Sequence, residues 1–359
     1  MASSSTQVTT AIAANNTASL TAVTVSGALS RCAHDEKYAH LFPEHERALA
    51  RHFFLMGKSA LGFGNYLLFS MVDGLWHSAQ RAIVDSATVR GLDELILLRK
   101  LLIKNRIHTA IQNGVEQVVF LGGGYDIRGL LTAMSHPSVA IYEIDIGETR
   151  KQKTKAIRRI PPGIGLGEFT VAREADGTVI VNKNLSLIEC DLRTADLFQV
   201  LQKHGYDKAE KTLIIAEGLT MYLTEAENQA LLQSLSANMS ENDEFLLSFI
   251  TRITYSALAD TAMKGAKESY KFSIAIDQLS PFLHACGFDM SGKFFTRFML
   301  DKIGATDILA HLETHPDTPE EHYFSLIKSQ APAPIPINDV PRLEFELPPK
   351  TEKPECVIQ

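Results

Sequence analysis

The sequence predicts an α/β protein with a doubly wound, mostly parallel β-sheet that follows a helical region. Beyond Gly114, short runs rich in β-branched and aromatic residues alternate with helical patterns, which is typical of a parallel sheet with helices on both faces. The first run ends in three glycines, and several others end in an acidic residue. Because parallel strands joined by helices bring their carboxyl ends to one edge, we expect a ligand site at that edge.

The amino-terminal part divides into a tail and a helical region. Residues 1–25 are mostly Ser, Thr, Ala and Asn, so few large apolar side chains offset the entropy of ordering, and we expect a flexible tail. Residues 26–113 carry apolar side chains at helical spacing until Gly114 ends the pattern. Within them, the apolar stretches 53–56 and 63–69 fit either a lid over a pocket or ordinary core helices.

Five strands are predicted for the sheet, and helices follow most of them. The strands comprise residues 117–121, 139–145, 185–190, 212–217 and 244–250.

Three further elements are predicted. A β-hairpin is expected as an insertion at 167–181, because Asp176-Gly177 separates two β-prone runs. A short helix is expected at 279–288 and a last strand at 322–328. The Pro-rich composition of residues 330–359 predicts an extended tail.

Composition excludes several classes of protein. The net charge of −7, with 35 basic and 42 acidic residues, gives no general attraction to nucleic acid, so no nucleic-acid partner is expected. The four cysteines are far apart in the sequence, which argues against a metal site or disulfide framework and favours a reducing, cytoplasmic location. The most apolar run, 59–72, is shorter than the ~20 residues of a membrane-spanning helix.

The glycine run is the first candidate cofactor site. A dinucleotide fingerprint that starts at Gly122 and Gly124 requires a third glycine where this chain has Ile127. That glycine accommodates a pyrophosphate, so its absence favours S-adenosylmethionine (SAM) over a nicotinamide dinucleotide. A structural turn between a strand and a helix is the alternative. Gly122, Gly124 and the acid that closes the turn, Asp126, are candidate cofactor-binding residues.

The next two strands end in candidate nucleoside ligands. Asp145 lies 21 residues after Gly124, where an acid can accept hydrogen bonds from ribose hydroxyls; Glu143 is the competing candidate on the same strand. Asp191 and Leu192 follow the third strand, where the carboxylate could bind the adenine amino group and the aliphatic side chain could cover the ring. A cap on a helix starting near Thr194 is the alternative for Asp191.

The fourth strand ends in Glu217, followed by Tyr222 and by a predicted capping box of Thr224 and Glu227. A carboxylate after Leu-Ile-Ile-Ala would be costly to bury unpaired. Glu217 therefore predicts a cationic or hydrogen-bonding ligand, such as the sulfonium or α-amino group of SAM. A salt bridge to an arginine is the alternative.

Four segments in this order resemble the leucine carboxyl methyltransferase family of SAM-dependent methyltransferases. The segments are Leu-Gly-Gly-Gly-Tyr-Asp-Ile-Arg at 121–128, Tyr-Glu-Ile-Asp at 142–145, Cys-Asp-Leu-Arg at 190–193 and Ala-Glu-Gly-Leu-Thr-Met-Tyr-Leu-Thr at 216–224. The resemblance covers about residues 28–328. It implies a seven-stranded, Rossmann-like domain at 26–329, with residues 26–113 as a helical lid.

The resemblance also implies roles for single residues. Gly122 would contact the methionine part of SAM, Asp145 the ribose, Asp191 and Leu192 the adenine, and Glu217 the methionyl end. An arginine before the first strand would bind the SAM carboxylate; spacing favours Arg99, and Arg106 is the alternative. The family's paired arginines are Arg99-Lys-Leu here, and its lysine near the amino terminus has no match.

Methyl transfer from a sulfonium is an in-line displacement in which the protein mainly aligns the groups and excludes water. A carboxylate acceptor, in a small molecule or at a protein C-terminus, needs no base; a hydroxyl acceptor needs one, and His52, His77 and His284 are then candidates. Glu217 and Tyr222 are the candidate catalytic residues.

The sequence ends in Cys356-Val-Ile-Gln, which fits a prenylation box favouring farnesyl. The box predicts membrane attachment through a farnesyl group on Cys356. A membrane-tethered SAM-binding adaptor without turnover is therefore the rival function. A nicotinamide dehydrogenase ranks third because of Ile127.

Overall fold

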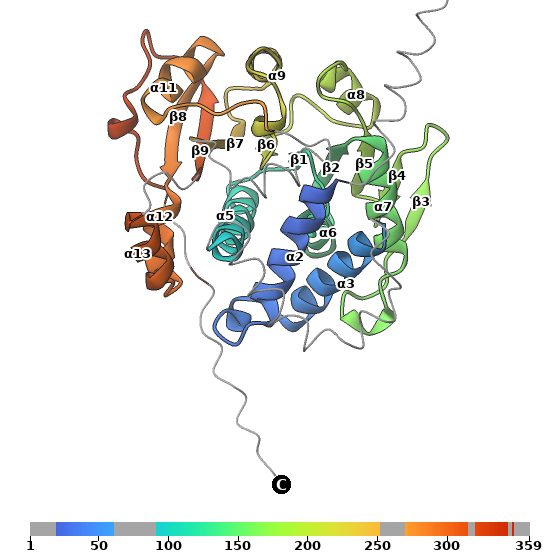
Figure 1. Cartoon of the computed structure of the whole chain (residues 1–359). Helices are drawn as coiled ribbons and strands as arrows, with labels where there is room; N and C mark the ends of the chain where they lie inside the picture. Colours follow the sequence, from blue (N-terminus) through green and yellow to red (C-terminus); the bar gives the residue numbers. More distant parts are fainter. Residues whose placement is uncertain (1–18, 61–90, 252–269, 315–319, 344–346, 348–359) are drawn as a thin grey trace, which may run out of the picture.

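A nine-stranded β-sheet with helices on both faces forms the centre of the computed structural model (Figure 1). The structure describes residues 19–60, 91–251, 270–314, 320–343 and 347. The apolar stretch 63–69, His77 and Cys356 lie outside these residues.

Five neighbouring parallel strands form the middle of the sheet, in the order β5-β2-β1-β6-β7. All five predicted strands are confirmed, each ending within one residue of its expected bounds. They are almost entirely buried, as expected for parallel strands covered on both faces. The strands are β1 (Gln117–Leu121), β2 (Ala140–Asp145), β5 (Leu185–Glu189), β6 (Thr212–Ala216) and β7 (Glu244–Ile250).

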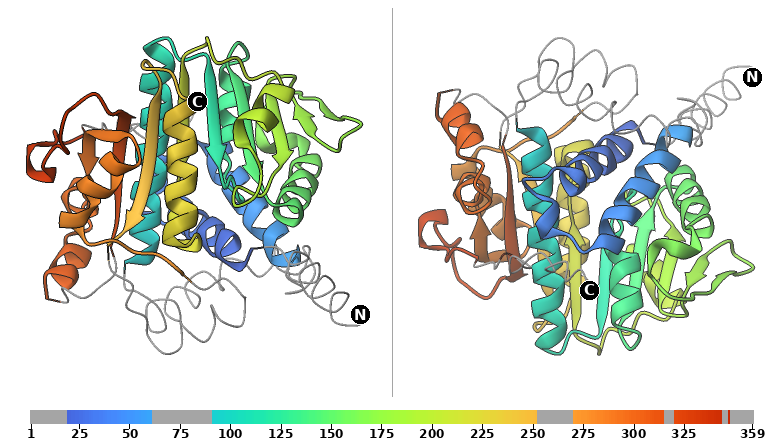
Figure 2. Two further views of the ribbon diagram at one scale, coloured as in Figure 1. Left: turned by 90° about the horizontal axis from the view of Figure 1, so that it is seen from above. Right: turned by 90° about the horizontal axis from the view of Figure 1, so that it is seen from below.

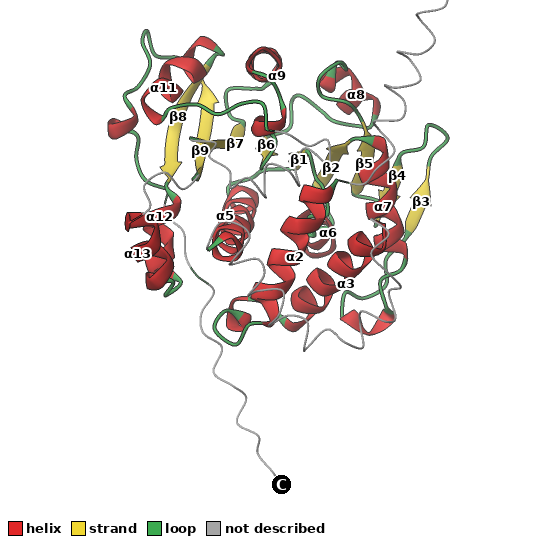
Figure 3. Cartoon of the chain, in the orientation of Figure 1, coloured by secondary structure: helices red, strands yellow, loops and turns green. Residues whose placement is uncertain are grey.

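Antiparallel strands extend the sheet at both ends (Figure 3). The predicted hairpin, β3 (Val171–Arg173) and β4 (Val179–Val181), pairs with β5. At the other end β9 (Glu321–Lys328) lies between β7 and β8 (Phe288–Phe294). The doubly wound fold class is confirmed, but the sheet has nine strands rather than seven because the hairpin joins its edge.

The helices form two layers on one side of the sheet and one on the other (Figures 1 and 2). One face carries α8 (Leu197–Lys203), α9 (Glu225–Asn238) and α11 (Ile276–Ala285). The opposite face carries α5 (Leu92–Gln112), α6 (Arg128–Ser135) and α7 (Gly147–Arg158). The outer layer, α2 (Leu20–His34) and α3 (Glu44–Ala60), packs on α5 and α7.

Short elements complete the described chain. They are α12 (Thr296–Lys302), α13 (Thr306–Thr314), η1 (Ala39–Leu41), η2 (Pro162–Ile164), η3 (Thr220–Tyr222) and η4 (Ile337–Asp339). None of the helices in the described part of the chain is both long and apolar enough to cross a bilayer.

The two ends of the domain differ from their expected boundaries. Helix α2 begins at Leu20, with Ser19 as its cap, inside the segment expected to be a tail. Residues 330–343 pack on the sheet: the Lys293 N–H donates to Pro341 O at 2.8 Å, and the Leu343 N–H donates to Lys293 O at 2.8 Å. This segment covers edge strand β8, which protects unpaired backbone groups.

Burial bears on one predicted apolar stretch and on one strand that was not predicted. Residues Phe53 to Met56 of α3 are at most 6% exposed, so this stretch packs in the core; Leu55 also lines a cavity, and the lid stays a prediction. Strand β8 was not predicted because Asp289 and Lys293 interrupt its apolar pattern. Both are nevertheless buried, since Asp289 pairs with His284 and Lys293 donates to the Asn338 carbonyl.

The capping box at the start of α9 is confirmed: the Glu227 N–H donates to Thr224 Oγ1 at 3.2 Å, and the Thr224 N–H donates to Glu227 Oε2 at 2.7 Å. We expect Thr224→Ala to lower the free energy of unfolding by about 1 kcal/mol, because one orphan N–H of the helix loses its acceptor. Urea denaturation measures this change. Thr224→Ser is the control and should retain most of the stability; equal losses in both variants would contradict the capping role.

Candidate functional site

The strand order brings four predicted residues to the same edge of the sheet. Gly122 follows β1, Asp145 ends β2, Asp191 comes two residues after β5 and Glu217 comes directly after β6. These strands are parallel neighbours, and Leu121 at the end of β1 pairs with both Ile144 of β2 and Ala216 of β6. The four residues therefore lie at the carboxyl-terminal edge, where open α/β sheets bind ligands.

The glycine turn and Asp145 are joined by hydrogen bonds. Gly122 and Gly124 have φ of +75° and +49°, a left-handed conformation that residues with a Cβ adopt at a cost. Asp145 Oδ2 accepts from the Gly124 N–H at 2.6 Å, and its Oδ1 accepts from the Ile146 N–H at 2.7 Å. Each carboxylate oxygen has a second lone pair, so Asp145 can hold the turn and still accept from a hydroxyl.

Six charged side chains form what we call the buried charge cluster, beside the ends of β1 and β6. Arg99 of α5 contacts Glu217, and its Nη1 lies 2.8 Å from Glu321 Oε2. Lys100 contacts Glu217 as well, and its Nζ lies 2.7 Å from Asp126 Oδ2. Arg128 completes the cluster by donating from Nε to Asp126 Oδ2 at 2.9 Å. Three cations thus balance three carboxylates.

Pairing keeps most of the cluster ionised despite its burial. Burial alone would raise the pKa of Asp126, but Arg128 and Lys100 outweigh it and hold that pKa well below its usual value. Burial would likewise raise the pKa of Glu321, which Arg99 lowers instead. Burial opposes the charge of Arg99 too, yet Glu217 and Glu321 raise its pKa. For Lys100, burial prevails and lowers the pKa.

Glu217 is already paired within this cluster. The alternative of a salt bridge to an arginine is therefore observed, so the burial of Glu217 does not by itself require a cationic ligand, and its role in binding SAM stays a prediction. The salt bridge forms because α5 presents two consecutive cations, Arg99 and Lys100, to this edge.

The structure also separates the two candidate arginines. Arg106 lies two helical turns after Arg99 and pairs with Glu244, at the amino-terminal end of β7. Arg106 is thus at the opposite edge of the sheet from the glycine turn, whereas Arg99 is at the same edge.

Asp191 lies on a partly exposed rim and does not cap a helix. Helix α8 begins at Leu197 with Asp196 as its cap, so the capping alternative for Asp191 was wrong. Asp191 instead accepts from Arg193 Nε at 2.8 Å and Nη2 at 2.6 Å. These hydrogen bonds lower the pKa of its carboxyl group.

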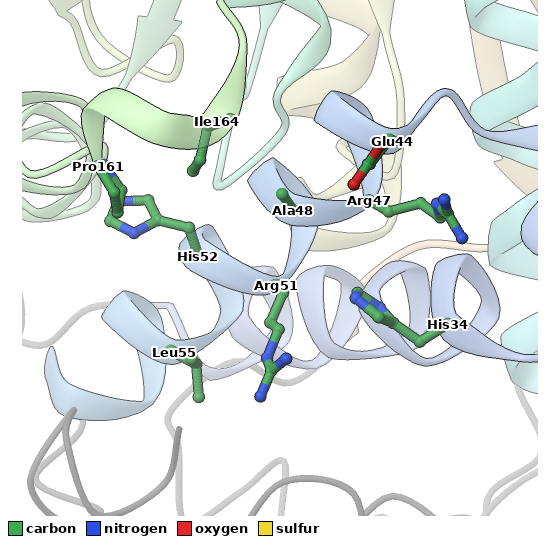
Figure 4. A pocket seen from close by; sticks show the side chains of 9 residues that line it. All are labelled: His34, Glu44, Arg47, Ala48, Arg51, His52, Leu55, Pro161 and Ile164. Carbon is green, nitrogen blue, oxygen red and sulfur yellow. The ribbon is translucent and has the colours of Figure 1, made fainter. Parts of the chain in front are cut away.

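The two candidate bases within the described residues, His52 and His284, lie away from this edge. His52 hydrogen-bonds Ala156 O through Nε2 at 2.8 Å, near the C-terminal end of α7, and burial lowers its pKa. It lines a cavity of about 580 Å³ with Pro161 and Ile164 (Figure 4). Asp145 precedes the other end of α7, roughly 18 Å away at 1.5 Å per residue.

His284 lies at the opposite edge as well, and Tyr222 lies at the predicted one. His284 Nδ1 lies 2.9 Å from Asp289 Oδ1 at the start of β8, which corresponds to the amino-terminal edge of β7. Tyr222, in η3 directly beyond Glu217, packs edge-on against Tyr270 with ring centroids 5.2 Å apart.

Sequence reasoning missed the roles of Lys100, Arg128 and Glu321 in the charge cluster. The available signal was Arg99-Lys100 inside the apolar run 96–103, since adjacent cations in a buried helix require carboxylate partners. Glu321 carried no such signal. It reaches the cluster because β9 starts beside the carboxyl end of β7, where Ile250 pairs with Glu321.

Comparisons with known proteins agree with the predicted family. A protein of Frankia alni named provisionally as an S-adenosyl-L-methionine-dependent methyltransferase is 30% identical over 175 residues, which are 48% of this chain and 54% of that protein. A similarly named protein of Streptomyces coelicolor is 27% identical over 62% of this chain and 73% of its own length. Leucine carboxyl methyltransferase 1 of Eremothecium gossypii is 30% identical over 34% of this chain and 38% of its own length.

Solved structures are more distant. Human N-acetylserotonin methyltransferase in complex with SAM matches with 12% identity and a TM-score of 0.37, over 80% of this chain and 57% of that chain. The family profile of leucine carboxyl methyltransferase matches residues 18–236, and its relatives support SAM as the cofactor predicted from the sequence. The chain belongs to the leucine carboxyl methyltransferase family.

Proposed function

We propose that this protein transfers the methyl group of SAM to an oxygen atom, and that the acceptor oxygen belongs to a carboxylate. The observation that carries the proposal is the meeting of the Gly122–Gly124 turn, Asp145, Asp191 and the buried charge cluster at one edge of the sheet. Membership of the family supports it.

The chemistry of these residues fits each part of SAM. The Gly122–Gly124 backbone would lie against the methionine portion, Asp145 would accept from the ribose hydroxyls, and Asp191 with Leu192 would bind the adenine. The methionine end carries an ammonium and a carboxylate on one carbon. Neighbouring groups of opposite charge suit such a zwitterion.

Different residues of the charge cluster would bind the two charged groups of the zwitterion. Glu217 would bind the ammonium, and Arg99 would bind the carboxylate with Lys100 as the second cation in place of the family's second arginine. Asp126, which is held by Arg128, would keep Lys100 oriented. Because the partners are already in contact, the protein holds them near the geometry that binding requires.

The same contacts would contribute to catalysis by alignment. With the cofactor bound, the available chemistry is transfer of a methyl group from a sulfonium centre. The protein's residues would fix the cofactor, hold the acceptor in line with it and exclude water from the site. Tyr222, in the short helix η3 that follows Glu217, would orient the acceptor.

A carboxylate acceptor is favoured because it needs no general base. His52 and His284 are both engaged in hydrogen bonds away from this edge. The Eremothecium relative is named for a leucine carboxyl group, which supports a protein C-terminus, and a small carboxylic acid is the alternative.

Asp145→Ala should weaken SAM binding. Hydrogen bonds to a charged group contribute about 1.5–3 kcal/mol, so we expect a dissociation constant about 10- to 100-fold higher. Isothermal titration calorimetry measures it. Asp176→Ala, which removes an exposed carboxylate on the hairpin turn, is the matched control and should bind like wild type; unchanged binding in both would refute the assigned ribose site.

The acceptor class is tested with a radiolabelled methyl donor and paired acceptors: peptides with a free or amidated C-terminus, and small acids beside the corresponding alcohols. We expect label only in the acceptors that carry a free carboxylate. Mild base should release it as methanol, because an ester hydrolyses and an ether does not. Base-stable label in the alcohols would contradict the carboxylate proposal. SAM binding without transfer to any acceptor would favour the adaptor.

Tyr222→Phe separates a role in acceptor orientation from one in cofactor binding. We expect kcat/KM for the acceptor to fall about tenfold, since one hydrogen bond that contributes near 1.4 kcal/mol is lost. The dissociation constant for SAM should stay unchanged. A weakened SAM affinity with unaltered kcat would place Tyr222 in the cofactor site instead.

A further inference from the structure

An ion pair lies directly beneath the glycine turn. Glu143 of β2 and Lys153 of α7 meet with Nζ 2.5 Å from Oε2, and both side chains are only 3% exposed. Lys153 Nζ also lies 3.4 Å from the Gly123 carbonyl oxygen. The pair therefore connects β2, α7 and the turn at a place that water does not reach.

The backbone of the turn rests on the Glu143 carboxylate. A Cβ on Gly129, in the first turn of α6, would lie 2.0 Å from Glu143 Oε1. A Cβ on Gly123 would lie 3.3 Å from Oε2. Glycine at these two positions thus lets the chain approach the carboxylate, and any movement of Glu143 must be transmitted to the turn.

Stability alone does not explain this pair. Replacing a buried ion pair with apolar side chains is often neutral or stabilising. Within the described residues, neither carboxylate oxygen of Glu143 accepts a hydrogen bond of normal geometry, so the contact with Lys153 is its main compensation. A poorly compensated charge directly under a ligand-binding turn indicates a role in that turn.

The charges around Glu143 determine its protonation. Burial raises its pKa to about 7, against the effect of Lys153. Asp126, from the loop after β1, and Asp145, on the same strand, also act to raise this pKa, and the value of about 7 includes their effects. Asp126 is itself paired with Arg128 of α6.

We propose that Glu143, paired with Lys153, is the positioning residue that sets the Gly122–Gly124 turn for SAM, and that SAM binds tightly only when Glu143 is ionised. The inference rests on the proposed function, in which the methionine portion of SAM, with its sulfonium, would lie against this turn. A positive charge there favours the carboxylate form of Glu143, so binding releases its proton.

The direction of the pH dependence follows. Below pH 7 the free protein carries a protonated Glu143, which must lose its proton when SAM binds, so affinity falls as the pH is lowered. Well above pH 7 Glu143 is already ionised and contributes no further change. One linked proton changes the dissociation constant by at most about tenfold per pH unit.

The experiment measures SAM binding to the full chain by calorimetry between pH 6 and 8.5, for wild type and Glu143→Gln. Wild type should bind about tenfold more weakly at pH 6 than at pH 8 and should release a proton, which buffers of different ionisation enthalpy detect. Glu143→Gln should bind SAM about tenfold more weakly than wild type at pH 8, and its dissociation constant should lack the part of the pH dependence that comes from Glu143. The α-amino group of the ligand titrates in both proteins, so the difference between them isolates Glu143.

Two further variants separate positioning from general stability. Glu244→Gln disrupts the Arg106–Glu244 pair at the opposite edge and should leave both affinity and pH profile unchanged. Gly129→Ala displaces Glu143 but keeps its charge; it should weaken binding while the slope remains, and it tests the proposal even where Glu143→Gln fails to fold. A wild type without SAM binding would refute the proposed function. Normal wild-type binding with the same affinity and slope in Glu143→Gln would overturn this inference alone.

Discussion

The site depends on one topological constraint, the parallel alignment of β5, β2, β1 and β6. Parallel strands need crossover connections, and these return the chain so that every strand ends at the same edge. Residues separated by almost a hundred positions, from Gly122 to Glu217, are thereby placed around one location. An antiparallel meander could not bring these residues together, because alternate strands would end at opposite edges.

The second constraint is electrostatic. Ionised side chains at the buried end of a sheet are costly unless each has a partner, and the cluster satisfies this with three cations and three carboxylates. Helix α5 supplies two of the cations, and β9 supplies a carboxylate from the other end of the chain. The helical region before the first strand is thus part of the site, and the late antiparallel strand is linked to it through Arg99.

The sequence was sufficient for the parallel core because its strands are continuous apolar runs that end at glycine or acidic residues. The same logic located Gly122, Asp145, Asp191 and Glu217, since a residue after a parallel strand can lie only at the carboxyl edge. It failed for β8, where the buried Asp289 and Lys293 interrupt the apolar pattern and are compensated by His284 and by the Asn338 carbonyl. It also failed for the partners of Glu217. Ion pairs depend on which residues are neighbours in three dimensions. The sequence therefore could not distinguish a ligand from an arginine as the partner of Glu217.

The balance of charge in the cluster bears on ligand selectivity. A zwitterionic head group adds one positive and one negative charge, so the cluster remains neutral when the proposed ligand binds. A ligand with only a carboxylate or only an amine would leave one buried charge uncompensated, which is strongly unfavourable.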